Sequence, residues 1–299
     1  MTLTMTLADS LKLTTDTLQA GVIETLATES KILAALPFMN IQGSGYTYNV
    51  ETELSDTEFR AVGEEISAGH AGYETRTEAL KILGDEAVID TFQIAVYGNV
   101  NDLMALEVGL KTKAIAHKFE KTFIAGDSVT NVKEFDGIDK RVKASQIVDF
   151  TSYKEKVEGQ DVPGYAKAMD EAIDKVQGTP SALIMNKTTR RQVVANFRKY
   201  MTFSTDEFGR QLTSYSDIPI MDVEDEVLPA KNTIYAVRFG AKEAVCGLTN
   251  GGVQVKPLGE VDNAPQLKTR IEWFVGLAVF NDKAIAKAAI SETPETPEP

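Results

Sequence analysis

The feature that most constrains the fold is a long acidic arm that runs directly into an amphipathic helix, over residues 43–127. From Tyr46 to Glu78 the arm holds eight acidic residues, two arginines and no lysine. It has too few apolar side chains to order itself. Strand-like alternation over residues 46–50 and 87–94 predicts a projecting two-stranded hairpin. Because an isolated hairpin is only marginally stable in water, we expect this one to lie on another subunit.

A single long helix is predicted after the arm, from Asp102 to Ala125. Asn101 or Asp102 can cap it, and an early Glu107 with later lysines matches the helix macrodipole. Its apolar face consists of two neighbouring stripes. The first stripe holds Leu103, Leu106, Leu110, Ala114 and His117, and the second holds Met104, Val108, Ile115, Phe119 and Phe123. At 1.5 Å per residue the helix is about 36 Å long, which predicts a spine across a flat domain.

The segment before the arm predicts a helix from Gln19 to Leu36, which Pro37 ends. Its apolar face is narrow because Glu24, Thr28 and Glu29 interrupt it. Two interpretations therefore stay open. The segment is an arm that packs on a neighbouring subunit, or it is a helix of the local core.

The pattern after the spine is that of an α/β domain followed by strands. A helix over 164–176 precedes a core strand at 181–185, and Asn186 can cap a second, basic helix over 188–199. Further strands are expected at 218–223, 233–237, 244–248, 253–257, 267–280 and 284–290. Residues 291–299 are rich in Pro and Glu, which predicts a disordered tail.

Composition limits the classes of protein that fit. With 43% hydrophobic residues, the 299-residue chain can fill a real core. It has no run of eighteen apolar residues and no signal-like start, so we expect neither membrane insertion nor secretion. The lone Cys246 excludes an internal disulfide, and its apolar neighbours predict a buried thiol. The net charge of −13 disfavours sequence-specific binding of nucleic acid but allows the chain to enclose it.

No catalytic, cofactor or metal site is predicted. His70 and His117 lie in different elements, and neither has a metal-ligand partner at helical or strand spacing. Gly43-Ser44-Gly45 does not join a strand to a helix, which argues against a phosphate cradle. Four acids could bind a hard cation, although they lack the spacing of an EF-hand and a solvated turn is the favoured interpretation. These acids are Asp222, Glu224, Asp225 and Glu226.

The order of these elements resembles the HK97-type major capsid proteins of tailed bacteriophages, a fold that encapsulin shells also use. The resemblance covers Thr17 to Ile290, and order and spacing carry it because no single motif is specific. The matching segments are Phe123-Ile124-Ala125-Gly126-Asp127 with Phe135-Asp136-Gly137-Ile138, Ala182-Leu183-Ile184-Met185-Asn186, Asp217-Ile218-Pro219-Ile220 through Pro229, and Arg270 to Ala286.

The resemblance implies an α+β, HK97-like capsid fold in six parts. These are an N-terminal arm (1–42), an extended β-hairpin loop (43–95), a peripheral domain with the spine helix (96–150), a central α/β axial domain (151–240), return strands shared by both domains (241–290) and the disordered tail (291–299).

Two departures from the family prototype carry expectations of their own. The prototype joins a lysine of its extended loop to an asparagine of a neighbouring subunit, but this chain has no lysine between Tyr46 and Leu80. Autocatalytic crosslinking is therefore not expected. Only about forty residues precede the hairpin here, where the prototype has a long scaffolding segment. We expect assembly to use a separate scaffold or none.

The function implied is that of a non-enzymatic major capsid protein without cofactors, assembled in the bacterial host cytoplasm and found in the virion. It would form pentamers and hexamers of an icosahedral shell around double-stranded DNA, with separate scaffolding, portal and decoration proteins as candidate partners. The candidate interface residues are Arg60, Glu64, Glu65 and Arg76 on the arm and Arg190 and Arg191 on the basic helix. Two alternatives stay open: an encapsulin-like shell around a cargo enzyme, and a carboxylate-metal enzyme that uses residues 222–226.

Overall fold

The computed structural model describes most of the chain. The described residues are 4–7, 9–10, 14, 16–53, 55, 57, 59–65, 70, 72–97, 103–157, 160–198, 201–205, 211–261 and 264–290. The predicted tail at 291–299 and the predicted caps Asn101 and Asp102 lie outside these residues. Among the helices described, none is long and apolar enough to cross a membrane.

A five-stranded sheet forms the first half of the molecule, in the order β1-β2-β14-β15-β5. Its strands are β1 (Thr4–Met5), β2 (Phe38–Asn40), β14 (Val245–Val261), β15 (Ala264–Val279) and β5 (Lys81–Asp90). The strands predicted at 244–248 and 253–257 are one strand, because β14 continues through a register shift between Thr249 and Val253. Gly251 and Gly252 take positive φ angles at this bulge, a conformation that glycine adopts without steric cost.

The spine helix α5 (Leu103–Ala125) lies across one face of this sheet, as predicted. Only the second predicted stripe packs inward: Val108, Ile115, Phe119 and Phe123 are buried. The prediction of the first stripe is wrong, since Leu106 is 56% exposed and Leu110 is 54% exposed. The helix rests on the sheet by one face, and the first stripe lies on the side turned away from it.

The N-terminal segment belongs to the local core of the same chain. It forms α2 (Thr17–Glu29) and α3 (Lys31–Ala35), separated at Ser30, whose hydroxyl oxygen caps α3 by accepting from the Leu33 amide at 3.1 Å. Val22, Ile23 and Leu26 of α2 are buried in the hydrophobic cluster that contains the spine. The local-core interpretation is therefore the one that the structure supports.

The acidic arm forms a two-stranded hairpin, but with a different return strand from the one predicted. Strand β3 (Gly45–Glu53) pairs with β4 (Gly72–Ala79), in a register that sets Tyr48 opposite Arg76. Residues 87–90 of the predicted return strand lie instead in β5 beside β15, and residues 91–97 form helix α4 (Thr91–Tyr97). Polar cross-strand bonds order β4, such as the 2.9 Å bond between the Thr47 and Thr77 hydroxyls.

A seven-stranded sheet forms the second half, in the order β10-β11-β12-β9-β13-β16-β6. Its strands are β10 (Met201–Thr205), β11 (Gln211–Tyr215), β12 (Ile218–Val223), β9 (Ala182–Asn186), β13 (Thr233–Val237), β16 (Ile285–Ala289) and β6 (Ile147–Asp149). Helices α7 (Tyr165–Lys175) and α8 (Lys187–Phe197) pack on it, and the Asn186 side chain caps α8 by accepting from the Thr189 amide at 2.7 Å. The prediction agrees to within a few residues for β9, β12, β13, β16, α7 and α8, but it missed the strands β10, β11 and β6. The smaller elements are α6 (Ile138–Arg141) and the pair β7 (Lys154–Val157) and β8 (Gln160–Pro163).

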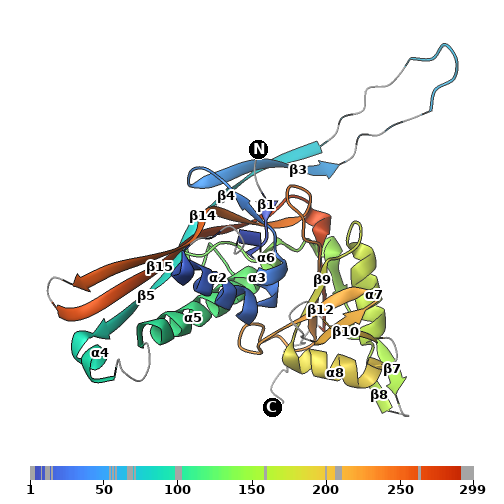
Figure 1. Cartoon of the computed structure of the whole chain (residues 1–299). Helices are drawn as coiled ribbons and strands as arrows, with labels where there is room; N and C mark the ends of the chain where they lie inside the picture. The colour runs from blue at the N-terminus through green and yellow to red at the C-terminus, as the bar shows by residue number, and fades with distance from the viewer. Residues whose placement is uncertain are drawn as a thin grey trace, which may run out of the picture.

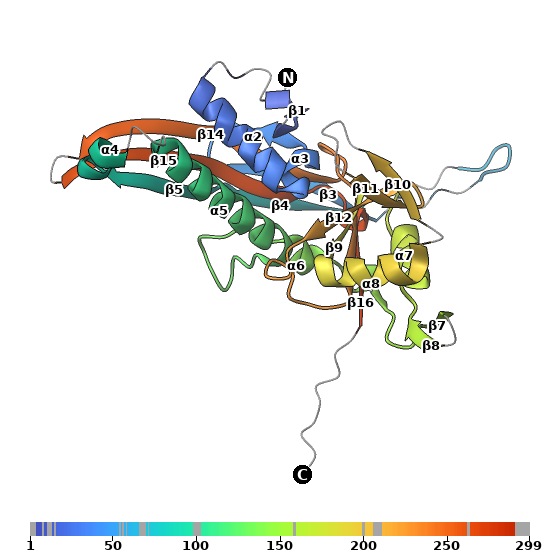
Figure 2. The same cartoon turned by 60° about the horizontal axis from the view of Figure 1, so that its bottom comes forward.

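The molecule is elongated, with projections at opposite ends. The β3–β4 hairpin extends from one end, and the β14–β15 pair with β5 extends from the other (Figures 1 and 2). The hairpin base lies on one face of the five-stranded sheet, while α2 and α5 cover the opposite face (Figure 1).

Candidate subunit interface

The base of the hairpin is packed firmly against the sheet. Tyr48 and Val50 are buried in a cluster with Met39, Cys246, Leu248 and Ala278. The Tyr48 ring lies 4.5 Å from that of Phe280, and its hydroxyl accepts from the Val279 amide at 3.1 Å. Burial, with the charge of Glu78 as a smaller cause, raises the pKa of Tyr48 to about 12. The hydroxyl therefore stays protonated and can donate as well as accept here.

Two arginine–carboxylate pairs fix the direction of the hairpin. Arg76 binds both carboxylate oxygens of Asp282, with Nη1–Oδ1 at 2.5 Å and Nη2–Oδ2 at 2.9 Å. Arg141 binds Glu78, with Nη2–Oε2 at 2.8 Å. All four side chains are at most 19% exposed. Bidentate pairs of this kind impose a geometry as well as an attraction, so they align the hairpin with the body of its own subunit.

The end of the hairpin is a locally bonded turn. The Arg60 guanidinium donates to the Glu64 carbonyl at 3.0 Å, and the Glu64 carboxylate accepts from the Ala61 amide at 2.8 Å. This turn leaves Phe59 and Val62 fully exposed. Our sequence analysis missed both residues, although two large apolar side chains within an acidic segment were a signal that could have identified them.

The six predicted interface residues therefore differ in their surroundings. Arg60 and Glu64 contact each other at the turn, Glu65 is exposed beside them, and Arg76 pairs within the chain at the hairpin base. The other two arginines lie on α8, which packs on the second sheet (Figure 1). Arg190 lies 3.7 Å from Asp222, and Arg191 is exposed.

Three of the four acids that were considered as cation ligands, Asp222, Glu224 and Asp225, contact protein groups. Asp222 pairs with Lys31, and this cation together with Arg190 keeps the pKa of Asp222 low although burial opposes it. Glu224 pairs with Lys187. The Asp225 carboxylate accepts from the Thr188 hydroxyl at 2.7 Å. Within the part of the chain that the structure describes, no three His, Cys, Asp or Glu side chains are grouped as a metal site would need.

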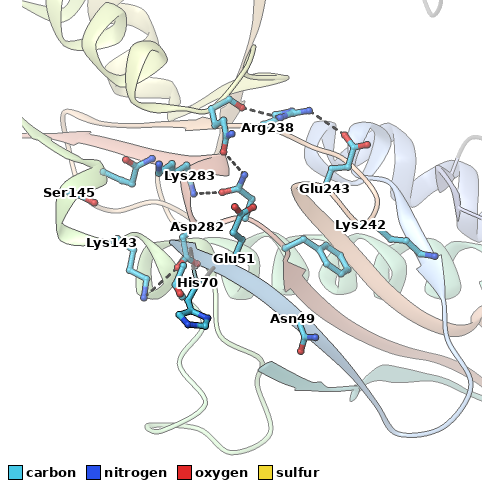
Figure 3. A pocket seen from close by; sticks show the side chains of 15 residues that line it. Asn49, Glu51, His70, Lys143, Ser145, Arg238, Lys242, Glu243, Asp282 and Lys283 are labelled. Carbon is cyan, nitrogen blue, oxygen red and sulfur yellow. Dashed lines mark hydrogen bonds and ion pairs between the residues drawn. The ribbon is translucent and has the colours of Figure 1, made fainter. Parts of the chain in front are cut away.

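A polar groove of about 1140 Å³ separates the hairpin from the loops of the second sheet (Figure 3). Asn49 and His70 line it from the hairpin, and Lys143, Arg238 and Lys283 line it from the other side. Both histidines of the chain are exposed. His70 lies at this groove, and His117 lies on the spine. Ion pairs such as Arg238–Glu243 (3.3 Å) already balance part of the charge in the groove.

The face of the sheet that carries the hairpin base is open further along β5 and β15. Side chains alternate along a strand, and Ile271, Trp273 and Val275 point into the core under α5. The intervening side chains point to the opposite face, where Ile82 is 73% exposed and Val88 is 38% exposed. A ladder of ion pairs lies beside these apolar residues. It consists of Lys268–Glu86, Arg270–Glu86, Arg270–Glu272 and Lys256–Glu272.

A buried carboxyl group joins the N-terminal segment to the spine. The Ser30 hydroxyl donates to Glu120 Oε1 at 2.6 Å, and Glu120 is only 6% exposed. Burial raises the pKa of Glu120, with smaller contributions from Glu224 and Asp222, against the opposing effects of the Ser30 bond and His117. The folded chain therefore holds the carboxyl proton of Glu120 more tightly than the unfolded chain. As the pH rises and Glu120 ionises, the free energy of unfolding decreases.

We therefore expect Glu120→Gln to change the pH dependence of stability. The glutamine keeps an acceptor for Ser30 but cannot ionise. Its free energy of unfolding should rise relative to wild type as the pH increases above about 4.3, the pKa of a free glutamate, and should level off above the folded-state pKa. Urea denaturation between pH 4 and 8 measures this, with the exposed Glu65→Gln as control. A loss of stability relative to wild type that grows as the pH rises would show that the carboxylate is instead required.

Comparisons with known proteins give the fold its context. Residues 14–162, about half of the chain, match the family described as major capsid protein GP7. Among solved structures, a chain of Mycobacterium phage Adephagia has a TM-score of 0.64 at 14% identity, covering 89% of this chain and 91% of that one. The capsid of the empty GTA particle gives 0.63 at 12% identity, covering 88% and 90%. The SrpI encapsulin of Synechococcus elongatus PCC 7942 gives 0.62 at 17% identity, covering 87% and 86%. No curated protein sequence matches.

The long spine under an open sheet, the projecting hairpin and the separate α/β half are those of the HK97-like fold. The chain belongs to the major capsid proteins, and its role is that of a capsid shell subunit.

Proposed function

We propose that this chain assembles as pentamers and hexamers into a closed icosahedral shell that encloses phage double-stranded DNA, and that it has no enzymatic activity. The observation that carries the proposal is a hairpin that is anchored at its base and projects from one end of an elongated subunit, combined with an open sheet face that runs along β5 and β15 toward the other end. A protrusion at one end and a matching surface at the other produce head-to-tail contacts, and such contacts close into rings when the rotation between subunits allows it.

The side from which the hairpin leaves the body decides which surface of the neighbour it meets. All subunits of a ring present the same face outward. The hairpin base rests on the sheet face opposite α5, so its end should reach that same face on the next subunit. We therefore place the contact on the open face of β5 and β15 and not on the spine.

The chemistry of the two surfaces is complementary. Phe59 and Val62 of the hairpin end are apolar and fully exposed, as Ile82 of the open face largely is. The ion-pair ladder contains three bases and two acids, which leaves one positive charge for the acidic Glu64 or Glu65. Exposed pairs contribute only about 0–1 kcal/mol each, so we assign most of the contact energy to the apolar residues. Arg60 and Glu64 then act by shaping the turn.

We retain the six-part division of the chain as part of this proposal. One hydrophobic cluster joins α7 and α8 to one face of the second sheet, which supports an axial domain at 151–240. A larger cluster runs from the spine and the first sheet to the other face of the second sheet, where the peripheral domain at 96–150 meets the axial one. Strands β14, β15 and β16, within 241–290, supply both sheets, which supports their description as shared return strands.

Engineered disulfides test the hairpin contact. The native Cys246 is fully buried and its burial raises the thiol pKa to about 12, so it will not compete. In assembled particles, Val62→Cys combined with Ile82→Cys or Val88→Cys should give covalent ladders of several subunits on oxidation. Val62→Cys combined with Leu110→Cys, on the opposite face of the sheet, is the matched control. Ladders from the control pair alone would refute this placement of the hairpin.

A second candidate function is an encapsulin-like shell around a cargo enzyme. The similarity to the SrpI encapsulin supports it at the level of the fold. Particles purified from the native source would distinguish the two, because the first proposal requires double-stranded DNA inside and the second requires a co-purifying enzyme.

A further inference from the structure

The loop between the spine and α6, residues 126–137, protrudes from the side of the molecule (Figure 2). Its two ends are closed on each other, since the Gly137 amide donates to the Gly126 carbonyl at 2.9 Å. A Cβ atom at Gly126 would lie 2.3 Å from the Phe135 carbonyl oxygen, so this close approach requires glycine. Phe135 itself is 5% exposed and anchors the loop in the core.

Hydrogen bonds within the loop fix its shape and compensate its charges. The Asp127 carboxylate accepts from the Val129 amide at 3.0 Å and from the Thr130 hydroxyl at 2.6 Å. Lys140 pairs with both Asp127 and Asp136. The hydrogen bond from Lys140 is the largest of several interactions that hold the pKa of Asp127 well below its usual value. Both acids therefore stay paired with Lys140.

Further contacts tie the loop to its neighbours. The Lys81 ammonium of β5 donates to the Val132 carbonyl at 2.6 Å. Lys118 of the spine pairs with Glu134 at 2.5 Å. The loop is therefore held from both the sheet and the helix, although its outer side chains point to solvent: Val129 is 80% exposed and Val132 is 75% exposed.

Five consecutive residues of the outer loop carry no charge, and the exposed Lys133 follows them. Ser128, Val129, Thr130, Asn131 and Val132 form this uncharged valine patch. The chain as a whole carries a net charge of −13, so two copies repel each other over most of their surfaces. The valine patch is a place where two copies can approach without that repulsion, and its fixed shape means that little conformational entropy is lost on contact.

We propose that the valine patch binds the valine patch of a second copy that belongs to a neighbouring ring of the shell. A contact between identical patches across a two-fold axis is self-complementary, which suits an uncharged apolar surface. This inference rests on the proposed shell assembly and adds to it, because the hairpin joins subunits within a ring while a closed shell also needs contacts between rings. The hairpin and the valine patch then perform separate steps.

A single engineered cysteine tests the contact, because only a self-complementary contact brings a residue next to its own copy. Oxidised particles of Val132→Cys or Val129→Cys should contain most of their chains as covalent dimers. Leu110→Cys, also an exposed position, is the matched control and should stay monomeric on a non-reducing gel. Closed shells in which neither valine variant forms more dimer than the control would overturn the inference, whether the loop is free or contacts a different protein.

A charge-repulsion variant supplies the functional test. Val129→Asp with Val132→Asp should keep the thermal unfolding of the wild-type subunit and still form rings, but should lose closed shells. Val129→Ser with Val132→Ser, which adds no charge, should lose fewer shells. Normal shells from the double aspartate variant would refute the valine contact and leave the hairpin proposal intact. Absence of both rings and shells in the wild-type protein would instead refute the proposed function, and the valine contact with it.

Discussion

Replacing Trp273 by alanine is expected to lower the free energy of unfolding by about 3–5 kcal/mol. The indole is 1% exposed and lies 5.2 Å from the Phe38 ring and 5.3 Å from the Phe119 ring. Its N–H donates to the Thr249 hydroxyl at 3.0 Å. One side chain thus joins β15 to β2, to the spine and to β14, and truncation leaves a cavity and an unpaired hydroxyl at their common centre.

Denaturant unfolding of the subunit measures this loss, and Phe59→Ala is the matched control. Phe59 is also a large aromatic residue but is fully exposed, so its removal should change the free energy of unfolding by no more than about 0.5 kcal/mol. A comparable loss in both variants would mean that the hairpin end is packed within its own subunit.

Deleting residues 56–73 is expected to abolish closed shells and to leave the subunit folded. The shortened chain can keep the pair Val50–Glu74, with residues 51–55 as the connection, which is a usual hairpin length. The anchors Tyr48, Arg76 and Glu78 remain at the hairpin base. Circular dichroism tests the fold and electron microscopy tests assembly. The conservative change Glu65→Gln, which keeps the hairpin, should still assemble, and normal shells from the deletion would refute the role of the hairpin end.

The sequence was sufficient to predict elements whose burial has a regular period. The spine was predictable because Val108, Ile115, Phe119 and Phe123 recur at helical spacing and are all buried. Strand β9 and helix α8 were predictable for a different reason, because a short continuous apolar run is followed by the capping residue Asn186. The stripe that contains Leu106 and Leu110 has the same spacing but is exposed. Periodicity alone therefore does not predict how many faces of a helix are covered by neighbouring elements.

The partner of a strand was much harder to predict than the strand itself. Residues 81–90 and 72–79 both alternate, and only the fold shows that the first pairs with β15 and the second with β3. The charges raised a similar difficulty. Arg76 is predicted at an interface between subunits, and its partner within the chain, Asp282, is 206 residues away in the sequence. Pairing across such a separation depends on the tertiary structure.

The apolar residues of the two candidate contact surfaces could not be identified from periodicity either. Phe59, Val62, Val129 and Val132 stand singly among polar neighbours, a pattern that also occurs in ordinary loops. Their significance depends on exposure together with the bonds that hold their backbones, and both of these require coordinates.

The most direct test of the central proposal is electron microscopy of the concentrated, purified protein, with size-exclusion chromatography of the same sample. We expect uniform closed shells, or rings of five and six subunits. A protein that stays strictly monomeric at every salt and protein concentration, both alone and with a scaffolding protein, would contradict the account.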